Sequence, residues 1–212
     1  MTHITTVLFD FDGVVANTEP QYDAFFDKVG EKYNLGFKSF AAMVKGVTMP
    51  NIIDKYLKHL PKEELDTIIK DTEEFERNMQ YPPVDGALEF IQYLKENGYN
   101  IGLVTSSQDF KMKIALEKMK LTGAFDTEVT ANRITEGKPN PMCYLLAAKD
   151  LNVSPDECAV FEDSFFGIQA GLDAGMRVIG LSTTNSEADL KKVIDRVIPD
   201  FADMRKVVGL LN

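Results

Sequence analysis

Cysteine is scarce in this sequence: Cys143 and Cys158 are the only two among 212 residues, and they form no Cys-x-x-Cys pair. Two such residues supply neither the framework of a disulfide-stapled secreted domain nor the ligand set of a zinc finger. Their expected role is that of small hydrophobes packed in a core. We therefore expect a protein of the reducing cytoplasm.

Long apolar runs are also missing. The run at residues 7–9 is too short for a signal peptide and ends at Asp10, and no stretch approaches the length that spans a bilayer. Histidine is equally rare, and His3 and His59 lie far apart with no metal or catalytic pattern around them. Both histidines are expected at the surface rather than in a site.

Positive charge is in the minority, because 23 Lys and Arg residues stand against 33 Asp and Glu residues, a formal net charge of −10. This surplus opposes binding to nucleic acids and to anionic membranes by simple attraction. It also disfavours anionic substrates at long range, so a phosphate ligand requires a metal ion or a local cation. The remaining composition, 44% hydrophobic and 26% charged, is that of an ordinary globular protein.

The hydrophobic pattern changes twice along the chain. Residues 5–9 form a short apolar run typical of a buried strand, and residues 19–80 then repeat apolar side chains at helical spacing. Tyr81-Pro82-Pro83 marks a boundary, since consecutive prolines oppose both helices and central strands. We therefore expect a core domain from residues 1–17 and 82–212, and a helical cap domain from residues 18–81.

Beyond the prolines, strands and helices alternate. Strands are expected at 100–104, 127–130, 158–161 and 177–181, and helices at 87–96, 110–119, 141–150 and 166–174. Such alternation requires right-handed crossovers between parallel strands. The predicted fold class is α/β: a Rossmann-like, doubly wound parallel sheet with an inserted α-helical bundle as cap.

Polar side chains follow four of the predicted strands at the point where each strand ends. They are Asp10 and Asp12, Thr105, Lys138, and the pair Glu162 and Asp163. Ligands bind at this edge of an open parallel sheet. The sequence therefore predicts that these residues form one site.

The acidic residues of this set predict a magnesium ion. Asp10 and Asp12 project to the same side of an extended segment, and Gly13 lets the chain turn tightly beside them. Crowded carboxylates repel one another unless a cation lies between them, and magnesium takes a few carboxylate oxygens together with a substrate phosphate. A turn or a calcium loop is the alternative for Asp-x-Asp-Gly alone, although no glutamate with calcium-loop spacing follows.

The remaining two positions also have ordinary alternatives. Thr105 could cap a helix, as could Ser106, Ser107 and Asp109, and a lone lysine such as Lys138 is usually a solvated charge. In the functional interpretation, the Thr105 hydroxyl donates to a phosphate oxygen. Lys138, fixed between Gly137 and Pro139, neutralises the nucleophile and the transferred phosphoryl group.

Four motifs occur in a fixed order: Leu8-Phe9-Asp10-Phe11-Asp12-Gly13, Val104-Thr105-Ser106-Ser107, Gly137-Lys138-Pro139 and Phe161-Glu162-Asp163-Ser164. They resemble the motifs of the haloacid dehalogenase superfamily, and more narrowly of its β-phosphoglucomutase-like branch, which carries an α-helical cap inserted after the first motif. The resemblance covers nearly the whole chain.

By this resemblance, Asp10 attacks phosphorus and becomes an aspartyl phosphate, while Asp12 protonates the leaving oxygen and then activates the second nucleophile. Thr105, Ser106 and Lys138 would hold the phosphoryl group. The resemblance also implies magnesium as cofactor, held by Asp10, the Asp12 carbonyl, Glu162 and Asp163. Covalent catalysis of this kind divides a difficult hydrolysis into two easier displacements.

The loop containing Lys45 and Thr48 resembles the cap loop that reaches over the substrate in mutase relatives, although a solvated helix turn is its alternative. An arginine that grips a second phosphate commonly follows in those relatives, whereas this chain has Met49, and a histidine commonly stands near the position of Tyr22. Both departures favour a phosphatase of sugar phosphates or similar small metabolites over a mutase. We expect a monomer that binds neither nucleic acid nor membrane.

Two other functions stay open. One is β-phosphoglucomutase itself, which interconverts β-glucose 1-phosphate and glucose 6-phosphate. The other is a non-enzymatic phospho-acceptor similar to a response-regulator receiver, which also combines an acidic pair, a Thr or Ser and a lysine. Receivers have no acidic pair after the lysine, whereas Glu162 and Asp163 follow Lys138 here.

Overall fold

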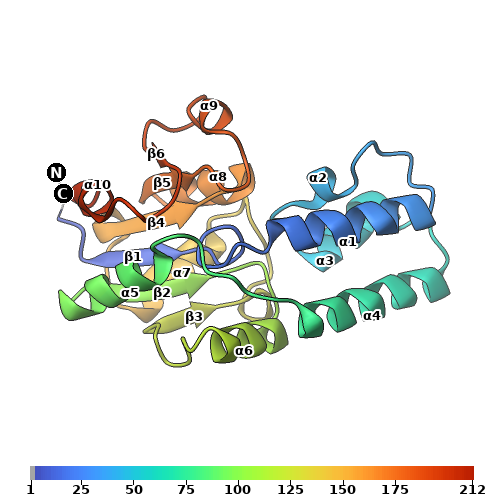
Figure 1. Cartoon of the computed structure of the whole chain (residues 1–212), viewed down its shortest axis with the longest axis horizontal. Helices are drawn as coiled ribbons and strands as arrows, with labels where there is room; N and C mark the ends of the chain where they lie inside the picture. Colours follow the sequence, from blue (N-terminus) through green and yellow to red (C-terminus); the bar gives the residue numbers. More distant parts are fainter. Residues whose placement is uncertain (1–2) are drawn as a thin grey trace.

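The computed structural model describes residues 3–212 and contains a six-stranded parallel sheet with the strand order β3-β2-β1-β4-β5-β6 (Figure 1). The strands are β1 Thr6–Phe9, β2 Asn100–Val104, β3 Thr127–Val129, β4 Cys158–Glu162, β5 Arg177–Leu181 and β6 Val197–Ile198. This arrangement confirms the predicted α/β, Rossmann-like class. Its order reverses between β1 and β4, which is where such sheets bind ligands.

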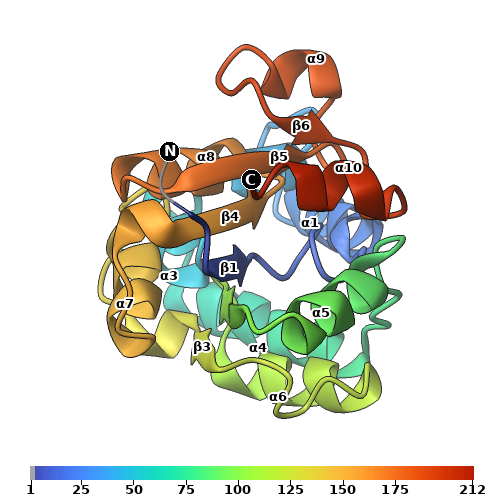
Figure 2. The ribbon, with the colours of Figure 1, turned by 90° about the vertical axis from the view of Figure 1, so that its left-hand side faces the viewer.

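Helices cover both faces of the sheet, as Figure 2 shows along the strands. On one face lie α5 Ala87–Glu96, α6 Asp109–Lys118 and α10 Met204–Gly209, and on the other lie α7 Met142–Asp150, α8 Phe165–Asp173 and the short α9 Glu187–Leu190. Two 3₁₀ turns, η2 Ala131–Arg133 and η3 Pro155–Glu157, precede α7 and β4. Because both faces are covered, every residue of the central strands β1 and β4 is buried.

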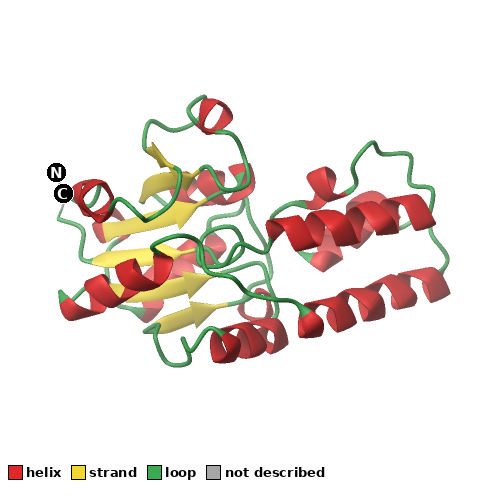
Figure 3. Ribbon diagram, in the orientation of Figure 1, coloured by secondary structure: helices red, strands yellow, loops and turns green. Residues whose placement is uncertain are grey.

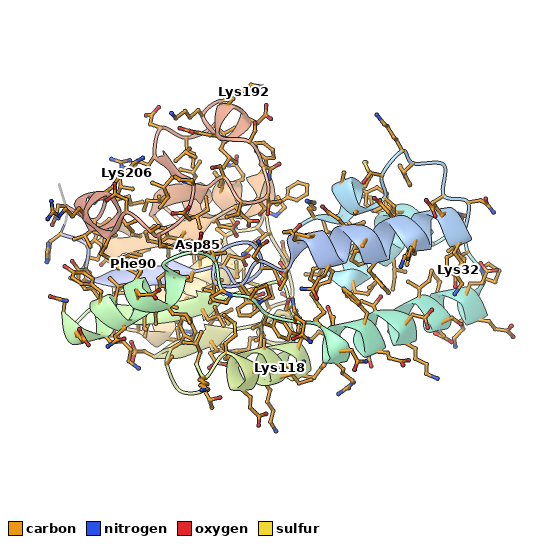
Figure 4. The ribbon with its side chains drawn as sticks, viewed as in Figure 1. Lys32, Asp85, Phe90, Lys118, Lys192 and Lys206 are labelled. Carbon is orange, nitrogen blue, oxygen red and sulfur yellow. The ribbon has the colours of Figure 1, made fainter. Side chains whose placement is uncertain are left out.

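An aromatic cluster fills the core under the first of these faces. Phe9 of β1 stacks on Phe161 of β4 with ring centroids 5.6 Å apart, and both rings contact Phe90 of α5, which is labelled in Figure 4. Phe201 packs against the same three rings. Leu8 alternates to the opposite face and packs beside Tyr144 of α7. The cluster fixes β1 against β4 immediately below the residues that follow them.

A separate group of helices, residues 19–78, lies beyond the carboxyl ends of the strands (Figure 3). It contains α1 Glu19–Lys32, α2 Ala41–Val44, α3 Met49–Ile52, the π-helical turn η1 Ile53–Leu57 and α4 Lys62–Asn78. These helices have a hydrophobic cluster of their own. Phe25 of α1 stacks on Phe75 of α4 with centroids 4.4 Å apart. We call this group the helical insertion. Among all helices in the described part of the chain, none is long and apolar enough to cross a bilayer.

The expected elements agree closely with the observed ones. The helix at 87–96 and the strands at 100–104 and 177–181 have their expected bounds, and the other elements of the core shift by one residue. β6, α9 and α10 were not expected from the sequence, because segments of two, four and six residues are too short to show a period. Pro61 directly precedes α4, where its fixed φ suits a helix start.

Candidate active site

The strand register brings the predicted residues to one edge of the sheet. Phe9 lies opposite Leu103 on one side and Phe161 on the other, so the residues that follow these strands are neighbours. A cavity opens between this edge and the helical insertion. From the predicted site, the residues that line it are Asp10, Asp12, Lys45, Thr48, Thr105, Ser106, Lys138 and Asp163.

A buried lysine joins two of the acidic motifs. Lys138 Nζ donates to Asp10 Oδ1 at 2.7 Å, to Glu162 Oε1 at 2.6 Å and to the Val104 carbonyl at 3.2 Å. Burial lowers the pKa of Lys138, but Asp10 and Glu162 raise it well above its usual range. Burial raises the pKa of Asp10 to about 7, against the opposing effect of Lys138. Lys138 is therefore a fixed cation beside Asp10 rather than a solvated surface charge.

The carboxylates of Asp10, Glu162 and Asp163 fit a divalent cation. One oxygen of each lies within 4.8 Å of the others, and all three residues are buried. Burial and the neighbouring carboxylates of Glu162 and Asp10 raise the pKa of Asp163 well above its usual range. Lys138 supplies one positive charge to this set, so a second cation is needed if all three are to ionise.

These three carboxylates differ in what already binds them. Both oxygens of Glu162 accept hydrogen bonds, Oε1 from Lys138 and the Tyr144 hydroxyl, and Oε2 from the Ser164 hydroxyl and two backbone N–H groups. Asp163 Oδ2 accepts only from the Thr184 hydroxyl among the described residues. Asp163 faces the cavity and Glu162 does not, so direct ligation by Glu162 stays a prediction.

Two glycines leave space for these carboxylates. Gly13 has a φ of +78°, and a Cβ at this position would overlap Asp163 Oδ2. A Cβ on Gly167, in the first turn of α8, would overlap the carboxylate of Glu162. Any larger residue would displace the acidic groups, which explains why glycine stands at both positions.

Asp12 is held by three side chains. Its Oδ1 accepts from the Thr18 hydroxyl at 2.6 Å, its Oδ2 accepts from the Ser107 hydroxyl at 2.9 Å, and Lys111 Nζ lies 2.6 Å from both oxygens. The Lys111 side chain is fully buried and also lies over the Tyr22 ring, 4.8 Å from its centroid. Four hydrogen bonds thus fix the orientation of the Asp12 carboxylate at the rim of the cavity.

Sequence reasoning did not identify Lys111. It lies 99 residues from Asp12 along the chain, and no motif surrounds it. The available signal was helical spacing: Lys111 shares the buried face of α6 with Met112 and Ala115, where a lysine requires a partner. Thr184 was also missed, although it follows the predicted strand 177–181 as the other site residues follow theirs.

The loop between α2 and α3 lies over the site. The Ser106 hydroxyl donates to the Gly46 carbonyl at 3.3 Å, and the Thr48 methyl lies 3.1 Å from the position that a Cβ on Gly137 would take. Lys45 from the same loop lines the cavity. The helical insertion therefore contacts both the Thr105 motif and the Lys138 motif, and it covers the catalytic edge.

Residues expected outside the site do lie outside it. His3 and His59 are exposed, and Cys143 and Cys158 are buried and free. Burial raises the pKa of the Cys143 thiol to about 11 and that of Cys158 to about 12. Neither thiol therefore has the thiolate character of a nucleophile.

Residues 7–181 match the model of the family described as haloacid dehalogenase-like hydrolase. The chain belongs to this family. It is 31% identical over 184 residues to a phosphorylated carbohydrates phosphatase of Thermotoga maritima, covering 82% of this chain and 84% of that protein. It is 27% identical to hexitol phosphatase A of Escherichia coli, covering 88% and 85%.

Among solved structures, a putative beta-phosphoglucomutase of Bacteroides vulgatus superimposes with a TM-score of 0.83 and 28% identity, over 99% of this chain and 89% of that one. The chain is an enzyme, a hydrolase of the phosphatase type.

The contact between Lys111 and Asp12 can be tested by removing the cation. We expect Lys111→Met to lower kcat for phosphomonoester hydrolysis by about tenfold or more, because Asp12 loses a preorganised charged donor. Lys113→Met, an exposed position on the same helix, is the matched control and should leave kcat unchanged. Steady-state kinetics on variants with native near-UV circular dichroism measure the effect; equal kcat values in both variants would contradict this role.

Proposed function

We propose that this protein is a magnesium-dependent phosphatase that hydrolyses a small phosphomonoester, a sugar phosphate or a similar metabolite, through an aspartyl phosphate on Asp10. The observation that carries the proposal is the position of Lys138, 2.7 Å from Asp10 Oδ1, beside Asp163 in a cavity covered by the helical insertion. The named carbohydrate and hexitol phosphatases support this substrate class.

In the first step, a carboxylate oxygen of Asp10 attacks phosphorus. No described residue donates a hydrogen bond to Asp10 Oδ2, so this oxygen is available for bond formation while Lys138 holds Oδ1. The new O–P bond forms as the bond between phosphorus and the leaving oxygen breaks. Asp12, protonated at the start of this step, donates its proton to that oxygen, and the leaving group departs as a neutral alcohol while the phosphoryl group stays on Asp10.

In the second step, Asp12, now a carboxylate, removes a proton from a water molecule that attacks the phosphorus of the aspartyl phosphate. The bond between phosphorus and Asp10 breaks, releasing inorganic phosphate and restoring the Asp10 carboxylate. Thr18, Ser107 and Lys111 hold Asp12 in one orientation through both transfers.

Two residues are placed to hold the phosphoryl group. The Thr105 hydroxyl oxygen accepts from the Ser107 N–H at 3.1 Å, which leaves its hydrogen free to donate to a phosphate oxygen. Lys138, in the loop before α7, contributes positive charge. The Ser106 hydroxyl, next to Thr105, donates a hydrogen bond to the Gly46 carbonyl of the helical insertion. These groups act where negative charge develops in the transition state.

The proposed magnesium ligands are Asp10, Asp163 and the backbone carbonyl of Asp12, with Glu162 behind them. When bound, magnesium supplies charge neutralisation for the phosphate oxygens. Glu162 orients Lys138 through the contact of 2.6 Å, and Thr184 orients Asp163. These contacts support Asp10 and Asp163 as metal ligands.

The proposed domain division follows the same boundaries as the sequence suggested. Residues 1–17 and 82–212 would form the core domain, and residues 18–81 the cap domain, in which Lys45 and Thr48 contact the leaving group. The separate hydrophobic cluster of the helical insertion supports this division. We also propose that the enzyme acts as a cytoplasmic monomer on small molecules, which its net charge of −10 and free cysteines favour.

A phosphomutase is the second candidate, favoured by the likeness to the putative beta-phosphoglucomutase. We expect β-glucose 1-phosphate, if it is turned over, to give glucose and inorganic phosphate, because Met49 supplies no cation for the second phosphate of a bisphosphate intermediate. Coupled assays for free phosphate and for glucose 6-phosphate distinguish the products. Accumulation of glucose 6-phosphate without phosphate release would support the mutase.

The nucleophile is tested by Asp10→Asn, which we expect to abolish phosphate release from p-nitrophenyl phosphate because the amide is a far weaker nucleophile than the carboxylate. Asp85→Asn, an exposed aspartate in the turn before α5, is the control with the same chemical change. Retention of more than a few per cent of activity by Asp10→Asn would exclude this residue as the nucleophile.

The metal is tested by chelation. Treatment with EDTA should reduce turnover to background, and added magnesium should restore it, because Asp10 and Asp163 are buried with one lysine to balance them. Phosphate release is measured before and after dialysis. Undiminished turnover in the chelated enzyme would eliminate the metal from the mechanism.

A further inference from the structure

The wall of the cavity opposite the catalytic carboxylates is acidic. Helices α1 and α4 present four carboxylates to the cavity: Glu19, Asp23, Glu73 and Glu76. Of the described residues of the helical insertion that line the cavity, Lys45 alone is cationic.

The charge of Lys45 is already balanced. Its Nζ lies 3.2 Å from Glu19 Oε2 and 3.1 Å from Asp23 Oδ1. Two carboxylates therefore surround one ammonium group, and the trio retains a net negative charge. A substrate anion placed here would compete with both carboxylates for the same lysine.

Neither Glu73 nor Glu76 forms an ion pair with another described residue, although the nearby Lys111 ammonium lowers the pKa of Glu76. Glu73 forms no hydrogen bond or ion pair with another described residue, and Glu76 accepts a hydrogen bond of 2.8 Å from the neutral hydroxyl of Tyr22. They are three residues apart on α4, so they lie on the same side of the helix. Burial raises the pKa of Glu76 and of Glu19, against the lowering effect of Lys111 on Glu76 and of Lys45 on Glu19.

Two buried cations pair with the carboxylates at the sheet edge. Lys138 contacts Asp10 and Glu162, and Lys111 contacts Asp12, so both serve the phosphoryl end of the substrate. Positive charge is thus paired with carboxylates at the sheet edge, whereas the helical insertion lines the cavity with four carboxylates and a single lysine. Such a distribution selects a substrate of the opposite pattern.

We propose that the leaving alcohol carries an ammonium group and no second anionic group, which makes the substrate a phosphomonoester of an amino sugar or another amino alcohol. This inference rests on the proposed phosphatase function. Glu73 and Glu76 receive the ammonium group, and the same carboxylates repel a carboxylate or a second phosphate. The shape of the phosphoryl site itself does not require this selection, because it is built from other residues.

Three six-carbon phosphomonoesters of similar size test the proposal. Glucosamine 6-phosphate, glucose 6-phosphate and 6-phosphogluconate differ in carrying an ammonium, no further charge, or a carboxylate. We expect kcat/KM to fall in this order, with the amino sugar preferred over the acid by about tenfold or more. The assay measures phosphate release by the unmodified enzyme with magnesium at constant ionic strength.

The outcomes separate the two proposals. If p-nitrophenyl phosphate is hydrolysed in an Asp10-dependent manner but glucosamine 6-phosphate is no better a substrate than 6-phosphogluconate, including no turnover of either, the inference on charge is overturned alone. If p-nitrophenyl phosphate is not hydrolysed, the phosphatase function itself fails, and the inference falls with it.

A matched pair of variants locates the effect. Glu73→Gln keeps the size of the side chain and removes one charge from the cavity wall, so we expect the preference for the amino sugar over the acid to decrease about threefold to fivefold, through KM. Glu74→Gln removes the adjacent charge, which is exposed and does not line the cavity, and should leave the preference unchanged. An equal change in both variants, or none in Glu73→Gln, would overturn the assignment of Glu73.

Discussion

A buried ammonium group between two carboxylates is the contact on which the catalytic edge depends. Lys138 bridges Asp10, which follows β1, and Glu162, which ends β4. The cost of removing these charges from water is high, and leaving one of them unpaired costs about 3–5 kcal/mol. The pairing ties the loop before α7 to the point where the strand order reverses. It also keeps Asp10 beside a permanent positive charge, where a phosphate ester can approach an otherwise strongly negative protein.

Around this contact, each acidic residue accepts hydrogen bonds from a different set of donors. These donors determine whether its carboxylate oxygens are free to bind a ligand. Glu162 is saturated by five hydrogen bonds and acts as a support. Asp163 faces the cavity with one hydroxyl partner, which leaves it free for a metal. Asp12 is fixed by Lys111, Thr18 and Ser107. In the proposed mechanism, carboxylates of one chemical type would thus serve as support, metal ligand and proton carrier because their surroundings differ.

The helical insertion completes the site without contributing to its central charges. Its loop contacts Ser106 and Gly137 of the core, and its acidic side chains line the cavity. In the proposed function, the sheet edge carries out phosphoryl transfer, and the insertion selects the alcohol that carries the phosphate. Selectivity would then depend on side chains of α1 and α4 that have no part in bond making.

The sequence by itself determined the alternation of strands and helices and the positions of Asp10, Thr105, Lys138 and Asp163, because buried strands have a local apolar pattern and polar residues at their ends stand out. Only the tertiary structure brought Lys111 to Asp12, since 99 residues separate them and one lysine on an amphipathic helix resembles any other. The same holds for the carboxylates facing the cavity from α1 and α4. A helix period identifies which side is polar, but packing against the core decides whether that side meets solvent or substrate.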